Sequence, residues 1–304
     1  MVGGSAAIAD ALARGVVKHG GKITRRAHVE EILVEGGRAV GVRVRGGRVL
    51  RAARGVVSNC DLWSTYKLIP QGACAALDTE RSQWERDTKK CGSFMHLHLG
   101  IDAAGLPDDL PPQWTVAQDW TLPIDAPGNV IVVSVPSLLD PSLAPPGRHV
   151  IHAYTAGNEP YDLWARFDQP PGANAGDEEV RHRGGSRADS REYEAFKEER
   201  AACLWAAIER EIPDVRQRAR VTLTGSPLTH ARFNRRHQGT YGPAIAAGKG
   251  SFPGQSTPLP GLYRCGDSTN PGIGVPAVAA SGALAANALM PLDQHLRLLD
   301  LIRM

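Results

Sequence analysis

The segment that most constrains the fold of this chain is GLYRCGDSTNPGIGVPAVAASGALAAN, residues 261–287. Leu262 to Cys265 read as a strand, Gly266-Asp267 as the turn that ends it, and the small residues from 277 onward as a helix. Pro276 suits the first position of that helix, because the N–H that proline lacks would have no partner there. The segment therefore predicts a strand, a glycine-rich loop and a helix, in that order.

This order of elements suits a nucleotide cofactor. Gly272 and Gly274 let the backbone approach a ligand closely. The N-terminal N–H groups and the dipole of the following helix can stabilise negative charge, while the Asp267 carboxylate can accept hydrogen bonds from hydroxyl groups. The alternative without a ligand is a tightly packed Ala/Gly helix after a Gly-Asp turn, in which the Asp267 side chain only hydrogen-bonds to its own backbone.

The same segment resembles the C-terminal flavin motif of the phytoene desaturase and carotenoid isomerase family of FAD-dependent oxidoreductases. Within that family, the likeness is greatest to the prolycopene isomerase group of plants and algae. Other stretches resemble the family in the same order: Gly3 to Val42, Val56 to Trp63, Phe94 to Asp102, His149 to Tyr161 and Arg235 to Ala244. Such collinear likeness over nearly the whole chain is much more specific than one glycine pattern.

The resemblance implies a set of FAD-binding residues: Val29, Gly266, Asp267, Gly274, Val275 and Pro276. Asp267 is expected to contact the ribityl chain, and the helix N-terminus to lie beside the isoalloxazine ring. The backbone of Val29 is expected to meet the adenine ring, although its side chain reads equally well as an ordinary core residue. No side chain is assigned as a catalytic acid or base.

One family element has no counterpart in this sequence. The family's proteins open with a strand and a G-x-G-x-x-G turn that holds the FAD pyrophosphate, and neither is present here. Met1 to Gly4 stand where the family has an internal Pro-x-Gly-Gly segment. We therefore expect a truncated sequence with an incomplete Rossmann-like domain, the alternative being that a partner chain supplies the missing half.

The fold class that we predict is α/β, an incomplete FAD-binding Rossmann-like domain interrupted by an α+β substrate domain with a mainly antiparallel sheet. The FAD-binding domain is expected at residues 1–61 and 226–304, and the substrate domain at 62–225. The first part contains a helix from Ser5, where Ile8, Leu12 and Val16 share a face. A β-meander follows, formed by Val29 to Glu35, Arg38 to Arg45 and Arg48 to Ala52, and then a return strand from Val56.

In the substrate domain the predicted strands are Phe94 to Gly100, Asn129 to Val135, Val150 to Ala156 and Arg220 to Gly225, with a helix from about Arg191 to Glu211. Residues 169–190 are rich in Gly, Pro and charge, so we expect a mobile surface insertion there. The resemblance implies that the sheet floors an apolar tunnel for a polyene. Candidate lining residues, for each of which an ordinary place in the core is the favoured reading, are Trp63, Leu68, Trp84, Trp114 and Trp120.

Two groups of polar residues are ambiguous. His96 and His98 fall on one face of their strand and His152 lies in another, but no further ligand pattern is evident, so we expect hydrogen-bonded or solvated histidines rather than a metal site. The basic group at 232–237 can contact a phosphate or an anionic membrane, or can form a solvated charged face.

Charge and hydropathy exclude some classes of protein. The chain has 35 basic and 32 acidic residues spread along its length, which gives no argument for a nucleic-acid partner. No stretch approaches the roughly 18 apolar residues of a membrane span, and no signal or transit peptide is recognisable. The predicted helix from Leu292 to Ile302 either docks on the fold or touches a membrane surface.

From the resemblance we expect an FAD-dependent enzyme that isomerises poly-cis-lycopene to all-trans-lycopene with reduced flavin and no net redox change. It also implies an apolar polyene substrate, a chloroplast location and peripheral membrane contact, and nothing indicates a partner protein. The alternatives are a carotenoid desaturase, a retinoid or carotenoid saturase, and a noncatalytic fragment unable to hold FAD.

Overall fold

The computed structural model describes residues 2–168, 191–246, 248 and 250–302. The chain divides into two compact units. The sheet unit contains residues 1–23, 92–234 and 238–240, and the mixed unit contains 24–91, 235–237 and 241–304. The insertion predicted at 169–190 lies outside the described residues. The assignment of cofactor and substrate domains to stretches of the sequence stays a prediction.

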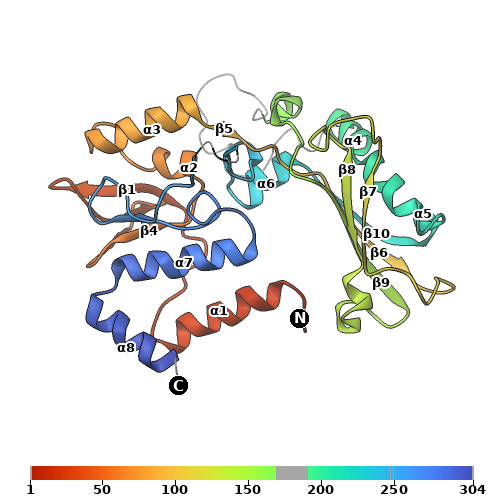
Figure 1. Cartoon of the computed structure of the whole chain (residues 1–304), viewed down its shortest axis with the longest axis horizontal. Helices are drawn as coiled ribbons and strands as arrows, with labels where there is room; N and C mark the ends of the chain where they lie inside the picture. The colour runs from red at the N-terminus through yellow and green to blue at the C-terminus, as the bar shows by residue number, and fades with distance from the viewer. Residues whose placement is uncertain (1, 169–190, 247, 249, 303–304) are drawn as a thin grey trace. The chain divides into compact units, whose positions relative to one another are not determined.

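A five-stranded antiparallel sheet forms the centre of the sheet unit (Figure 1). Its strands are β6 (His96–Asp102), β7 (Gln113–Ala117), β8 (Val130–Ser134), β9 (Arg148–Thr155) and β10 (Ala219–Gly225). They lie in the order β10-β6-β9-β8-β7. The predicted antiparallel sheet is therefore confirmed, and β7 is a strand that the sequence analysis missed.

The core of the sheet unit lies between the sheet and one long helix, α4 (Arg191–Glu209). Side chains alternate between the two faces of β6, so Leu97, Leu99 and Ile101 are buried while His96 and His98 face the other way. Leu204 and Ile208 of α4 are fully buried in the same cluster. Because of this alternation, one face of the sheet packs into the core and the other face carries the histidine side chains.

Shorter elements complete the sheet unit. They are α1 (Ala6–Lys18), α5 (Val215–Arg218), α6 (Pro227–Phe233) and the 3₁₀ turns Pro136–Leu138, Pro141–Leu143, Tyr161–Leu163 and Ala165–Phe167; a further 3₁₀ turn spans His237–Gly239. The predicted amphipathic helix at α1 is present, but none of its residues is buried. Trp120 is 89% exposed and so does not belong to a core.

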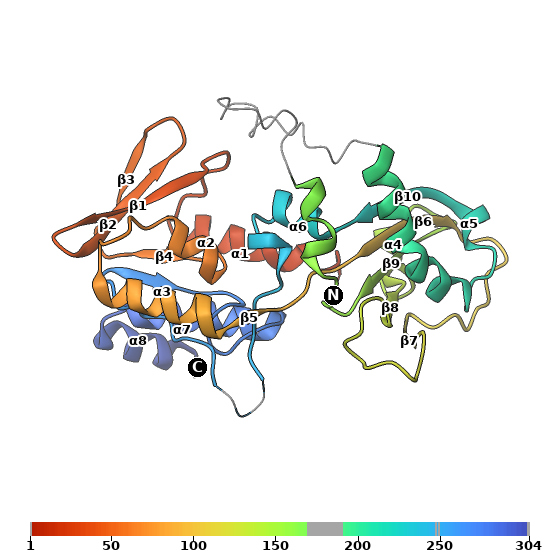
Figure 2. The ribbon, with the colours of Figure 1, turned by 90° about the horizontal axis from the view of Figure 1, so that it is seen from above.

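The mixed unit combines an antiparallel meander with a parallel strand pair (Figure 2). The meander consists of β1 (Val29–Glu35), β2 (Arg38–Val44) and β3 (Val49–Arg51), which confirms its prediction. Strand β4 (Val56–Ser58) pairs in parallel with β12 (Leu262–Arg264), and β5 (Lys89–Lys90) pairs with β11 (Pro243–Ala244). The helices are α2 (Leu62–Lys67), α3 (Ala75–Asp87), α7 (Val275–Leu289) and α8 (Leu292–Ile302).

Figure 1 shows α2 and α3 on one side of the β4–β12 pair and α7 on the other. A buried ion pair fixes β12 to α3: Arg264, 4% exposed, donates from Nη1 to Glu80 Oε1 at 2.6 Å. The hydroxyl of Tyr66 in α2 donates to the same carboxylate oxygen at 2.7 Å, and burial together with that carboxylate raises the pKa of Tyr66. Two helices are thus held to the strand that leads into the glycine-rich loop.

The C-terminal helix α8 forms as predicted, and its His295 Nδ1 lies 3.1 Å from Oδ1 of Asn287 in α7. None of its residues is buried, and Leu292 and Ile302 are 71% and 70% exposed. The predicted apolar face is therefore largely exposed, with Leu299 half-buried. Among those residues, no helix combines the length and the apolar character that crossing a membrane requires.

Candidate functional site

The turn that follows β12 is tied to α7 by buried hydroxyl groups. The backbone N–H of Gly266 donates to Ser281 Oγ at 3.0 Å. Thr269 Oγ1 donates to the Gly266 carbonyl at 2.8 Å, so the Ser281 hydroxyl must donate in turn to Thr269 Oγ1, 2.6 Å away. This closed set of bonds fixes the turn against the first half of the helix.

Gly266 is required at this turn by both conformation and space. Its φ of 106° is a value that side-chain-bearing residues rarely adopt. A Cβ atom at this position would lie 2.7 Å from Nδ2 of Asn59, which itself donates to the Cys265 carbonyl at 3.3 Å. The backbone of the turn therefore passes directly against the end of β4.

Asp267 forms an ion pair with Arg236. Arg236 Nη1 donates to Oδ1 at 2.9 Å and to Oδ2 at 2.8 Å, and the two side chains are only 15% and 22% exposed. Of the alternatives for the basic group at 232–237, a solvated charged face does not apply to Arg236. A carboxylate has about four lone-pair sites, so Asp267 keeps capacity to accept further hydrogen bonds.

The segment that carries Arg236 is anchored by Asp61. This buried residue caps α2 by accepting from the Ser64 backbone N–H at 2.8 Å, and it also accepts from the His237 backbone N–H at 2.9 Å. One carboxylate therefore fixes both the start of α2 and the residue next to Arg236.

His237 sits in a basic surrounding. Its ring stacks on Trp63 with centroids 5.8 Å apart, and Lys67 Nζ donates to its Nδ1 at 3.0 Å. Burial, followed by the charges of Lys67 and Lys90, lowers the pKa of His237 to about 4. The imidazole is consequently neutral at pH 7.

Helix α7 begins after a glycine that has free space around it, Gly274. Gly274 is its N-cap with φ 108°, Val275 and Pro276 occupy the first two helical positions, and a Cβ on Gly274 would meet no described atom within 4 Å. The donors and acceptors fit a flavin: helix N–H groups for a negatively charged ring edge, the Asp267 carboxylate for sugar-alcohol hydroxyls, and open space for close approach.

The structure brings together five of the six predicted FAD-binding residues, since Gly266, Asp267, Gly274, Val275 and Pro276 all lie in the loop between β12 and α7 or at the start of that helix. Val29 lies in the same unit but in the meander, where it is half-buried. The role of all six in cofactor binding stays a prediction. No role was predicted for Asn59, Asp61 or Ser281, although the aspartate before the Leu62 helix is a recognisable N-cap signal.

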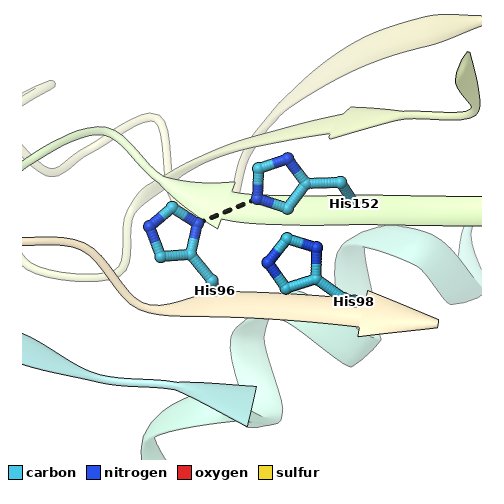
Figure 3. Close-up of side chains that lie close together, drawn as sticks. All are labelled: His96, His98 and His152. Atoms are coloured by element: carbon cyan, nitrogen blue, oxygen red, sulfur yellow. Dashed lines mark hydrogen bonds between the residues drawn. The ribbon is translucent and has the colours of Figure 1, made fainter. Parts of the chain in front are cut away.

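A second polar group occurs in the sheet unit. One ring nitrogen from each of His96, His98 and His152 lies within 4.8 Å of the others (Figure 3). Burial and then the neighbouring imidazoles lower the pKa of His96 to about 3 and that of His152 to about 4, and burial also lowers the pKa of His98. The rings of His96 and His152 are hydrogen-bonded to each other, as one of the two expected arrangements has it, and the three histidines form one packed cluster.

Residues 1–183 match the family model described as flavin-containing amine oxidoreductase. The chain is 34% identical to the chloroplastic prolycopene isomerase of Arabidopsis thaliana, over 98% of this chain and 47% of that protein. It is 27% identical to the neurosporene-forming phytoene desaturase of Cereibacter sphaeroides, over 94% of this chain and 52% of that protein. The chain thus spans about half the length of the curated relatives that it matches.

Among solved structures, an oxidoreductase from Methanosarcina mazei superposes with a TM-score of 0.51 at 18% identity, covering 92% of this chain and 53% of that one. At this identity the likeness concerns the fold alone. It agrees with the predicted α/β class.

Proposed function

This chain belongs to the family of flavin-containing amine oxidoreductases, and from that premise we propose that it acts in FAD-dependent carotenoid isomerisation. The proposed reaction converts poly-cis-lycopene to all-trans-lycopene with reduced flavin and no net redox change. The observation that carries the proposal is the β12–α7 loop, with Asp267 fixed by Arg236 beside the open start of α7. Similarity to prolycopene isomerases over nearly the entire chain supports the choice of reaction.

The proposed roles follow from the donors and acceptors of the loop. Asp267 accepts hydrogen bonds from ribityl hydroxyls, and Arg236 fixes the orientation of its carboxylate. The first N–H groups of α7 stabilise negative charge at the ring edge. A bound reduced flavin would supply the electron density that lowers the double-bond order of the polyene, and the chain's own residues position the reactants.

An apolar polyene is the substrate class that we propose. Val221 and Leu223 of β10 are more than half exposed and offer apolar contact surface. The exposed leucines of α8 support peripheral contact with a membrane, where carotenoids dissolve. A plastid location belongs to the same proposal, because the isomerase relatives carry chloroplastic names.

A direct test has two steps. The purified 304-residue chain is incubated with FAD and freed of excess cofactor, and its visible absorption spectrum is recorded. The flavin-loaded protein is then reduced and incubated with poly-cis-lycopene, and the isomers are separated by chromatography. We expect retained flavin and a rise in all-trans-lycopene. Retained flavin with unchanged isomer ratios would refute the isomerase assignment.

A carotenoid desaturase is the second candidate, because phytoene desaturases are among the relatives. The same incubation separates the two reactions. Isomerisation leaves the number of conjugated double bonds unchanged, whereas desaturation increases it, and the mass and the absorption spectrum of the product record the difference.

A further inference from the structure

The histidine cluster of the sheet unit arises from strand register. His98 of β6 lies directly opposite His152 of β9, and His96 precedes His98 by two residues on the same face. Figure 3 shows the three rings gathered on one side of these two strands. Residues separated by more than 50 positions in sequence are therefore brought together by ordinary antiparallel pairing.

The nitrogens of the cluster are already close to coordination distance. His96 Nδ1 lies 2.8 Å from His152 Nε2, and the rings of His98 and His152 stack in parallel with centroids 4.2 Å apart. Two nitrogens that bind one tetrahedral zinc ion lie about 3.3 Å apart, given Zn–N bonds of about 2.0–2.1 Å. Side-chain rotations that break the parallel stack of His98 and His152 would turn all three lone pairs toward one ion, since none of the three nitrogens is more than 4.8 Å from another.

A fourth histidine supports the cluster from α6. His96 Nε2, the nitrogen that does not face His152, lies 2.9 Å from His230 Nε2. Metal-bound histidines commonly donate their other ring N–H to a neighbouring acceptor, which fixes the ring and its tautomer. His230 is placed to accept such a bond and thus to aim Nδ1 of His96 into the cluster.

We propose that His96, His98 and His152 together bind one divalent transition-metal ion of the zinc class. Three imidazole nitrogens suit zinc, copper and nickel better than magnesium or calcium, which prefer oxygen ligands. A neutral imidazole offers one ring nitrogen lone pair, and a change of tautomer selects the nitrogen that faces the ion. His98 is exposed, which gives the ion a route of entry.

Three protein ligands leave one tetrahedral position open. An open position is the arrangement of zinc sites that bind water or an exchangeable ligand, whereas structural zinc sites have four protein ligands. The proposed ion also links β6 to β9 by side chains on the face that α4 does not cover. Binding should therefore raise the thermal stability of the sheet unit as well as fill the site.

The test is zinc titration of the untagged, metal-free 304-residue chain by isothermal calorimetry, with Co²⁺ absorption as an independent report of nitrogen ligation. We expect one saturable zinc site per chain. His98→Asn and His152→Asn should each weaken zinc binding at least about tenfold, because loss even of an outer partner commonly costs about 10- to 100-fold. His19→Asn, which changes an exposed histidine elsewhere, should bind zinc as the wild type does.

Circular dichroism of the metal-free variants separates lost binding from lost folding, and His98 is the safer position because its side chain is exposed. Absence of a saturable site in the wild type would overturn the proposal. So would wild-type zinc affinity in either cluster variant. Because no step of the test uses flavin or carotenoid, its result is independent of the proposed isomerase activity.

Discussion

One guanidinium nitrogen, Nη1 of Arg236, lies within 2.9 Å of both carboxylate oxygens of Asp267. The contact joins the segment after α6 to the turn after β12, which are 31 residues apart. Because both side chains are largely buried, this pair resists screening by salt more than a surface pair does. It sets the direction in which the remaining lone pairs of Asp267 point.

Replacing Arg236 with methionine should weaken FAD binding by about tenfold, or about 1.4 kcal/mol, because the Asp267 carboxylate loses its orienting partner. Fluorescence titration of FAD measures the change. Arg235→Met is the matched control. Arg235 is next to Arg236 in sequence and its side chain is exposed, so this variant should bind FAD as the wild type does. Equal FAD affinity in Arg236→Met and Arg235→Met would contradict a role for Arg236 in the cofactor site.

Glu80→Gln should lower the free energy of unfolding of the mixed unit by about 2 kcal/mol. The substitution leaves the buried guanidinium of Arg264 without its charged partner, and Glu80 itself is only 21% exposed. Glu85→Gln in the same helix breaks an ion pair with Arg81 that is 49% exposed at the glutamate, so its effect should stay below about 0.5 kcal/mol. Urea denaturation of both variants makes the comparison, and similar losses would show that burial of the pair is unimportant.

Gly266→Ala should destabilise the chain by about 1–3 kcal/mol, since alanine would be strained at this φ and would collide with Asn59. Gly282→Ala in α7 makes the same chemical change at a helical position where a Cβ meets nothing within 4 Å. It should stabilise the chain by about 0.5–1 kcal/mol. Thermal unfolding distinguishes the two, and a neutral Gly266→Ala would mean that the turn can relax.

Local pattern predicted the elements better than it predicted their contacts. The meander was readable because Gly36-Gly37 and Gly46-Gly47 bracket a strand in which Val40, Val42 and Val44 alternate with other residues. The loop before α7 could likewise be predicted from its glycines, Gly272 and Gly274. Strand β7 was missed because its apolar alternation is short and lies next to two prolines.

Contacts between distant segments had no local signal. His237 bonds to Asp61 across 176 positions, so the placement of Arg236 beside Asp267 depends on how the chain folds back. The histidine cluster depends on the pairing of β6 with β9, and a register change of one residue would turn His152 to the opposite face. Sequence therefore identified both histidine strands but not the distances between their rings.

His237 should make stability depend on pH in a defined direction. Its pKa is about 4 in the folded chain, against 6.5 for an ordinary histidine, so between these limits the unfolded chain binds a proton that the folded chain does not. Stability therefore rises with pH across this window, and it falls as the pH is lowered from 6.5 towards 4. Below about pH 4 both states are protonated and this residue causes no further loss.

The measurement is the free energy of unfolding in urea at several pH values across that window, for the wild type and for His237→Gln. The variant should show a shallower rise with pH, because glutamine does not titrate. His96 and His152 titrate in the same direction in both proteins, so the difference between the two curves isolates His237. His19→Gln, at an exposed position, should keep the wild-type slope. An unchanged slope in His237→Gln would mean that Lys67, Lys90 and burial do not disfavour the charged imidazole as the structure implies.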